Sequence, residues 1–66
     1  MTFKKLKKIY SSHPDFEATE KDYKFKMRGF VFYDNHEIDL NGRLFAFDVS
    51  FDDMDKLIKK HWELDK

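Results

Sequence analysis

The chain has 66 residues, no cysteine, and 13 basic and 13 acidic side chains that cancel. At this length only one hydrophobic core can form, so residues 1–66 are expected to make a single domain. The absence of cysteine excludes a disulfide framework and a thiolate metal site, and it favours an intracellular, cytoplasmic protein. With a net charge of zero, the chain lacks the excess of basic residues that is typical of nucleic-acid binders.

No stretch of the sequence approaches the roughly 20 apolar residues that a membrane-spanning helix needs. Residues 1–8 are rich in lysine and lack the apolar run of a signal peptide. We therefore expect no membrane partner. A composition rich in lysine and phenylalanine and free of cysteine also favours, by association alone, a small accessory protein of an AT-rich bacterium or its phage.

The first expected element is a short amphipathic helix behind Thr2, which is a favourable N-cap residue. Apolar residues recur at intervals of three and four between Phe3 and Tyr10, and lysines occupy the opposite side. Pro14 and its polar neighbours end this helix in a turn. Residues 16–22 fit either a helical turn or a short extended segment, and we favour a helical turn or loop.

The next expected element is a strand over residues 23–33, in which aromatic residues and methionine alternate with cations as far as Arg28. The alternation changes phase after Gly29, and a β-bulge at this point would keep one continuous inward face. That face is expected to hold Phe25, Met27, Phe30 and Phe32. A three- or five-residue loop around residues 34–36, with Asn35 in the left-handed conformation, would turn the chain back so that Ile38 pairs opposite Phe32 and joins this face.

Asn41 and Gly42 between two apolar runs are typical of a two-residue type I′ hairpin turn, in which Gly42 has a positive φ. Counting outward from this turn places Leu40 opposite Arg43 and Ile38 opposite Phe45. The predicted inner face of the hairpin holds Ile38, Leu40, Phe45, Phe47 and Val49.

Ser50 followed by Asp53 is a capping arrangement that begins a C-terminal helix. Its apolar stripe, expected to lie across the aromatic face of the sheet, comprises Met54, Leu57, Ile58, His61 and Trp62. The expected fold class is therefore α+β, a three-stranded antiparallel β-meander packed by a C-terminal helix, with a short N-terminal helix. The sequence leaves open whether the N-terminal helix covers the outer face of the sheet.

No catalytic or ligand-binding motif is present. His13, His36 and His61 are the only side chains suited to acid–base work near neutral pH, and none belongs to a metal-ligand motif. The carboxylates lie mostly beside lysines, and both glycines are assigned to strand and turn geometry. We therefore expect no enzyme activity, no metal and no cofactor.

The segment Arg28-Gly29-Phe30-Val31-Phe32 resembles the start of the RNP1 motif of the RNA-recognition-motif family. The resemblance would imply that its two phenylalanines stack on bases. Tyr33 and Asn35 depart from the rest of the motif, and the chain lacks the βαββαβ order of that family. Our expected register instead places Phe30 and Phe32 in the core.

The expected α-β-β-β-α order resembles the double-stranded-RNA-binding domain, and its last two thirds resemble the arm-binding domains of phage integrases in element order. The first resemblance would imply phosphate-binding lysines at the start of the last helix. This chain has Asp52, Asp53 and Asp55 there, and their carboxylates would repel phosphate. The topology is therefore expected without the activity.

Two candidate surfaces remain. The first is an outer sheet patch that the inner core does not require, made of Val31, Tyr33, Leu44 and Ala46. The second is the basic first half of the chain, with Lys4, Lys5, Lys7, Lys8, Lys24, Lys26 and Arg28. We interpret the chain as a non-enzymatic interaction module that binds a protein partner or forms a homodimer through the apolar patch. The alternative is a nucleic-acid-binding accessory protein that uses the basic residues.

Overall fold

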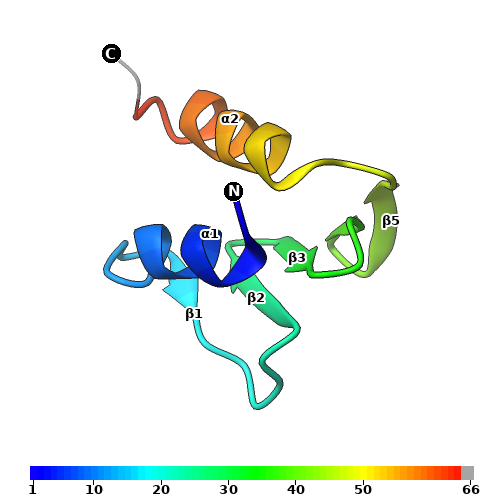
Figure 1. Ribbon diagram of the computed structural model, residues 1–66, viewed down its shortest axis with the longest axis horizontal. Helices are drawn as coiled ribbons and strands as arrows, with labels where there is room; N and C mark the ends of the chain where they lie inside the picture. The colour runs from blue at the N-terminus through cyan, green and yellow to red at the C-terminus, as the bar shows by residue number, and fades with distance from the viewer. Residues whose placement is uncertain (65–66) are drawn as a thin grey trace.

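The computed structural model describes residues 1–64 as two helices and one antiparallel sheet (Figure 1). The helices are α1, Phe3–Tyr10, and α2, Phe51–His61. The strands lie in the sheet in chain order and are β1 (Phe16–Glu17), β2 (Lys24–Met27), β3 (Phe30–Tyr33), β4 (Ile38–Leu40) and β5 (Arg43–Ala46). The α+β class with a helix at each end is confirmed, and the sheet has five strands where three were predicted.

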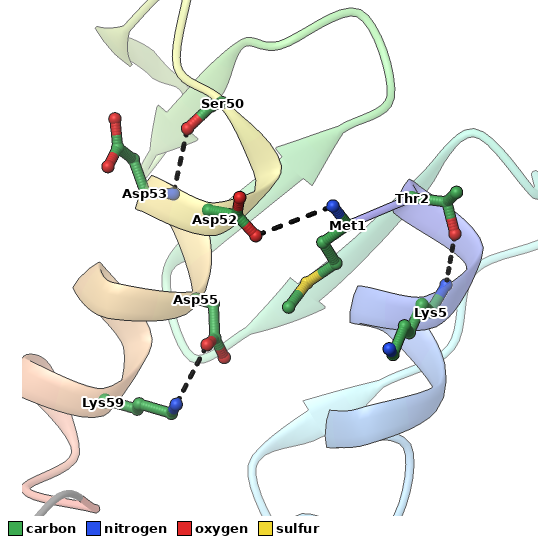
Figure 2. Close-up of polar contacts among 8 residues, drawn as sticks. All are labelled: Met1, Thr2, Lys5, Ser50, Asp52, Asp53, Asp55 and Lys59. Carbon is green, nitrogen blue, oxygen red and sulfur yellow. Dashed lines mark hydrogen bonds and ion pairs between the residues drawn. The ribbon is translucent and has the colours of Figure 1, made fainter.

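Both helices begin at the predicted capping residues (Figure 2). Thr2 Oγ1 accepts a hydrogen bond of 3.1 Å from the backbone N–H of Lys5, and Ser50 Oγ accepts one of 3.1 Å from that of Asp53. The Asp52 carboxylate lies in the first turn of α2, 3.7 Å from the N-terminal ammonium group of the chain. Negative charge at this position is favoured by the helix dipole.

Both helices pack on the same face of the sheet, which is the inner face. Phe3 joins the layers, because its ring centroid lies 5.6 Å from that of Phe25 in β2 and 5.6 Å from that of Phe51 in α2. The buried core comprises Phe3, Leu6, Tyr10, Phe25, Met27, Phe30, Phe32, Ile38, Met54 and Ile58. Within residues 1–64, therefore, no helix covers the outer face of the sheet.

The prediction of one strand over residues 23–33 is wrong, because Arg28 and Gly29 form a two-residue turn between β2 and β3. The opposed pairs are Phe25 with Phe32 and Met27 with Phe30. Residues directly opposite each other in an antiparallel pair share a face. The turn therefore yields the same inward set of four residues that a bulge would have given.

Gly29 serves a close approach between two neighbouring turns. The backbone N–H of Asn41 donates a 2.9 Å hydrogen bond to the Gly29 carbonyl. A Cβ atom at Gly29 would lie 2.3 Å from Asn41 Oδ1, so a larger residue would displace the Asn41 side chain. The phase change in the sequence itself follows from the two-residue turn, which places Met27 opposite Phe30, and not from a bulge.

The predicted turn between β4 and β5 is confirmed. Asn41 and Gly42 have φ values of 51° and 82°, as a type I′ turn requires, and Leu40 pairs with Arg43. No atom lies within 4 Å of a Cβ built on Gly42, so its glycine is needed for the backbone angle alone.

The loop before β4 brings Ile38 opposite Phe32, as expected. Its left-handed residue, however, is His36, with φ of 69°, and not Asn35. The backbone of His36 is fixed from outside the loop, because its carbonyl accepts a 2.9 Å hydrogen bond from the Val49 N–H and its Nδ1 lies 3.0 Å from the Val49 carbonyl oxygen. These long-range contacts are invisible to local turn propensity.

The expected register of β5 is also wrong beyond Leu44. A bulge shifts the pairing, so Ile38 lies opposite Ala46 and not opposite Phe45. Ala46 packs against the core, whereas Phe45 and Phe47, which were predicted as core residues, are 48% and 66% exposed. The bulge leaves Phe45 without a partner in β4, and because β4 begins only at Ile38, the chain beyond Ala46 has no paired strand.

Of residues 16–22, for which a helical turn or loop was favoured, Phe16–Glu17 form the strand β1 and residues 18–22 form a loop. Phe16 pairs with Met27, and its ring stacks on that of Phe25 with 5.3 Å between centroids. Burial of this aromatic side chain against the sheet outweighs the weak local preference for a helix start.

Candidate interaction surface

The outer face of the sheet carries a row of side chains that crosses all five strands. The register places Glu17 beside Lys26, then Val31, Asp39 and finally Leu44 in β5. Val31 is half-buried and Leu44 is exposed. The row therefore begins with the charged pair Glu17 and Lys26 at β1 and β2. It ends, beyond Asp39 in β4, with the apolar side chain of Leu44 in β5.

Tyr33 lies beside this row and is held by its sheet neighbours. Its O–H donates a 3.2 Å hydrogen bond to Asp39 Oδ2, and the Lys24 ammonium lies 5.9 Å from its ring centroid. Burial, followed by the hydrogen bond to Asp39, raises the pKa of Tyr33. The phenol is thus a neutral hydrogen-bond donor held within the sheet, and Tyr33 as a whole is half-buried.

The four residues of the predicted apolar patch do not all share one face. Val31, Tyr33 and Leu44 lie on the outer face, but the bulge in β5 turns Ala46 toward the core. Asp39 separates Val31 from Leu44 in the cross-strand row. The apolar character that is accessible therefore gathers at β5.

β5 is an edge strand with exposed apolar side chains. Leu44 is 58% exposed, more than Phe45 and less than Phe47. The Phe45 ring makes an edge contact with buried Phe30, with 5.5 Å between ring centroids, so it leans toward the inner face. No charged residue or proline lies between Leu44 and Phe47, although proteins commonly use such residues to block a sheet edge.

Sequence reasoning missed Phe45 and Phe47 as surface residues because it extended the alternation of the last strand through residue 49. The sequence did hold one indication, which was the short length of the strand that pairs with β5. Only Ile38–Leu40 can pair between the preceding loop and the turn, so a regular partner for Phe47 was lacking from the start.

The basic residues of the alternative prediction lie on two sides of the sheet. Lys24 and Lys26 belong to the outer face, whereas α1 lies on the inner face and carries Lys4, Lys5, Lys7 and Lys8. The Lys7 ammonium lies 3.9 Å from an Asp22 oxygen, and Arg28 Nε donates to Asp15 Oδ2 at 2.8 Å. The seven cations therefore form no single continuous surface.

A polar cluster surrounds Asp15 near the end of α2. Asp15 Oδ2 accepts hydrogen bonds from Trp62 Nε1 at 2.7 Å and Arg28 Nε at 2.8 Å. The Arg28 guanidinium also lies 5.7 Å from the Trp62 ring centroid. The Trp62 hydrogen bond, and to a lesser degree Arg28, holds the pKa of Asp15 below its usual range. The polar groups of Asp15, Arg28 and Trp62 all bind one another, so we interpret the cluster as structural.

A second buried contact joins the two helices. The Tyr10 O–H donates to the Asp55 carboxylate. Asp55 Oδ2 also lies 3.0 Å from Lys59 Nζ (Figure 2). Burial and, after it, the contact with Asp55 raise the pKa of Tyr10. Asp55 is a buried carboxylate with two donors, as such a group requires.

In residues 1–64 no three histidine, aspartate or glutamate side chains are arranged to hold a metal ion. The same part of the chain contains no helix that is long and apolar enough to cross a membrane. No protein-family model, curated protein or solved structure matches this chain. Inference about function therefore depends on the surfaces of the fold.

Proposed function

We propose that this chain is a non-enzymatic interaction domain that binds another protein through the edge strand β5 and the adjoining outer face. The supporting observation is that Leu44, Phe45 and Phe47 are exposed together on an unblocked edge. Small soluble domains seldom leave such residues uncovered without a use for them.

An edge strand offers two kinds of contact at once. The backbone groups along its free side can pair with a strand of the partner, which fixes orientation. The apolar side chains then supply most of the free energy of binding, as central anchors of interfaces do. The Tyr33 and Asp39 pair lies next to Leu44 on the outer face and would form part of a polar rim.

The test is a paired substitution, Leu44→Lys with Phe47→Lys. Both side chains are exposed, so the monomer should stay folded, which circular dichroism and thermal unfolding verify. We expect this variant to lose self-association and the capture of any partner protein that the wild type retains. Binding at wild-type strength by this variant would show that β5 is not the interface.

The matched control is Lys24→Glu with Lys26→Glu, two substitutions on the same outer face but away from the edge. Charges at a rim act mainly on the association rate and its salt dependence. We therefore expect the control to slow binding and to leave the bound complex detectable.

Nucleic-acid binding is a second candidate, favoured by one observation. Lys4, Lys5 and Lys8 are exposed and line one surface of α1 together with Ile9. Phosphate contacts weaken steeply with salt, so a titration of a generic duplex and a single strand at two salt concentrations tests this candidate. Salt-sensitive binding that Lys4→Glu with Lys8→Glu abolishes would support it, and the absence of binding at low salt would exclude it.

A further inference from the structure

We propose that the groove between α1 and the β1 segment binds a small apolar carboxylate, a single chain or ring that carries one anionic group. The groove has a volume of about 740 Å³, within the range of roughly 300–1,000 Å³ that is typical of small-ligand sites. Its surface is mostly apolar, and its few polar groups are mainly charged. The groove uses no residue of β5, so this site is independent of the proposed interaction surface.

One wall of the groove is a face of α1. Lys4, Lys7 and Lys8 line it, and Ser11, which follows directly after the helix, continues it. Residues three and four apart share one face of a helix, so the three ammonium groups belong to the same side of α1. α1 contains no acidic residue that could balance them.

This arrangement of lysines is unfavourable for the helix itself. Like charges three and four residues apart repel each other, and Lys4 lies in the first turn, where the helix dipole disfavours a cation. Departures from such local rules are expected at functional sites. An anion bound beside this wall would reduce both penalties, because it would place negative charge next to the lysines.

Lys7 is already held in position at the groove. Its side chain is only 25% exposed, and its ammonium group lies 3.9 Å from the Asp22 carboxylate and donates a 3.5 Å hydrogen bond to the Asp22 backbone carbonyl. These contacts tie α1 to the loop after β1, so this cation needs little reordering to receive an anion. Lys4 and Lys8 are exposed and, within residues 1–64, form no ion pair.

The apolar part of the groove is aromatic. Phe3 from α1 and Phe16 from β1 both line it. Both rings pack on the buried ring of Phe25, with 5.6 Å and 5.3 Å between ring centroids, so the surface that they form is fixed. Phe16 is half-buried, and part of it stays accessible. Burial of a chain or ring against this surface would supply the apolar share of the binding free energy.

The balance of charge selects a ligand with one anionic group. Asp22 and Asp34 also line the groove, so its three lysines exceed its carboxylates by a single charge. A nucleic acid or a strongly acidic peptide would bring further negative charge against these two aspartates. The ammonium group of lysine is a compact point charge, which suits a single carboxylate as well as it suits a larger anion.

A titration followed by the NMR signals of the backbone amides tests the class of ligand. The probe is decanoate below its micelle concentration, and the signals of residues that line the groove should shift together. Acetate lacks the apolar chain and decyltrimethylammonium carries a cationic head group, so each should bind at least about tenfold more weakly than decanoate. Shifts confined to residues outside the groove, or equal binding of the three compounds, would overturn the proposal.

Matched substitutions in α1 test the site. Lys8→Gln removes one charge from the wall, whereas Lys5→Gln removes the same charge from the same helix outside the groove. Both side chains are exposed, so both variants should stay folded, which thermal unfolding verifies. We expect Lys8→Gln to weaken decanoate binding about fivefold and Lys5→Gln to weaken it less than about twofold. Equal effects would overturn the proposal, because binding would then follow net charge alone.

Vesicles of an anionic phospholipid distinguish a free ligand from a membrane surface. A groove of this kind takes up one molecule at a time, so the wild type should bind free decanoate and should not sediment with the vesicles. Sedimentation with the vesicles in the absence of any decanoate binding would overturn the proposal, since the lysines of α1 would then recognise a lipid surface.

Discussion

The Asp15 carboxylate receives hydrogen bonds from Trp62 Nε1 and from Arg28 Nε. Trp62 follows α2 directly and Arg28 lies in the turn after β2, so one side chain links three segments of the chain. Its lowered pKa is the electrostatic consequence, because both donors favour the ionised form.

This lowered pKa predicts a specific dependence of stability on pH. Asp15 is more acidic in the folded state than in the unfolded chain, where aspartate has a pKa of about 3.9. Its contribution to the free energy of unfolding is therefore full above that pH and is lost as pH falls through the folded value. Asp15→Asn should lower Tm at pH 7 and make its decline below about pH 4 less steep.

Thermal unfolding followed by circular dichroism from pH 7 to acid measures this effect, with the exposed carboxylate variant Glu20→Gln as control. Glu20→Gln should follow the wild type at every pH. An Asp15→Asn variant with the same acid slope as the wild type would mean that the cluster contributes no pH-dependent stability.

At the scale of elements, β3 carries a buried phenylalanine, whereas the segment directly after β5 carries an exposed one. Phe32 is fully buried, whereas Phe47 is 66% exposed. Phe32→Ala should therefore cost about 3–5 kcal/mol of unfolding free energy. Phe47→Ala should stay within about 0.5 kcal/mol in the monomer. Urea unfolding at low protein concentration measures both losses, and equal losses would contradict the observed register.

Local signals were sufficient for the turn at residues 41–42 and for both helix starts. The caps at Thr2 and Ser50 and the turn at residues 41–42 each involve contacts within four residues of sequence. They could therefore be predicted without knowledge of the rest of the chain. β1 and the bulge in β5 depend on distant partners. Phe16 is extended because its ring packs on that of Phe25, and Ala46 turns inward because the bulge places it opposite Ile38.

The same distinction explains which part of the candidate surface could be predicted. Val31, Tyr33 and Leu44 follow from simple alternation, and they lie on the outer face as expected. Phe45 and Phe47 were assigned to the core because alternation cannot register an added residue in one strand. Their exposure became visible only with the pairing of β4 and β5.

At the scale of the whole molecule, the Tyr10 contact with Asp55 joins helices from the two ends of the chain, 45 residues apart. Tyr10→Phe removes one of the two donors to a buried carboxylate, and we expect it to cost about 1–3 kcal/mol. The raised pKa of Tyr10 adds a pH signature. The phenol stabilises the fold fully below its unfolded pKa of about 10, and this contribution is lost as pH rises above it.

Alkaline unfolding of wild type and Tyr10→Phe tests this tie. The wild type should lose Tm more steeply above about pH 10 than the variant, which no longer ionises at this position. Tyr23→Phe, on an exposed ring, serves as the control and should keep the wild-type slope. Parallel curves for wild type and Tyr10→Phe would show that the ionisation of Tyr10 does not limit alkaline stability.

The sheet order has a consequence for how the chain folds. Every strand pairs with its neighbour in sequence, so each hairpin closes over a short loop at low entropic cost. Topologies built from such local pairings fold fast. The two helices, in contrast, are far apart in the sequence, and we therefore expect them to dock late in folding. Changes at the contact between Tyr10 and Asp55 should therefore accelerate unfolding and leave the folding rate almost unchanged.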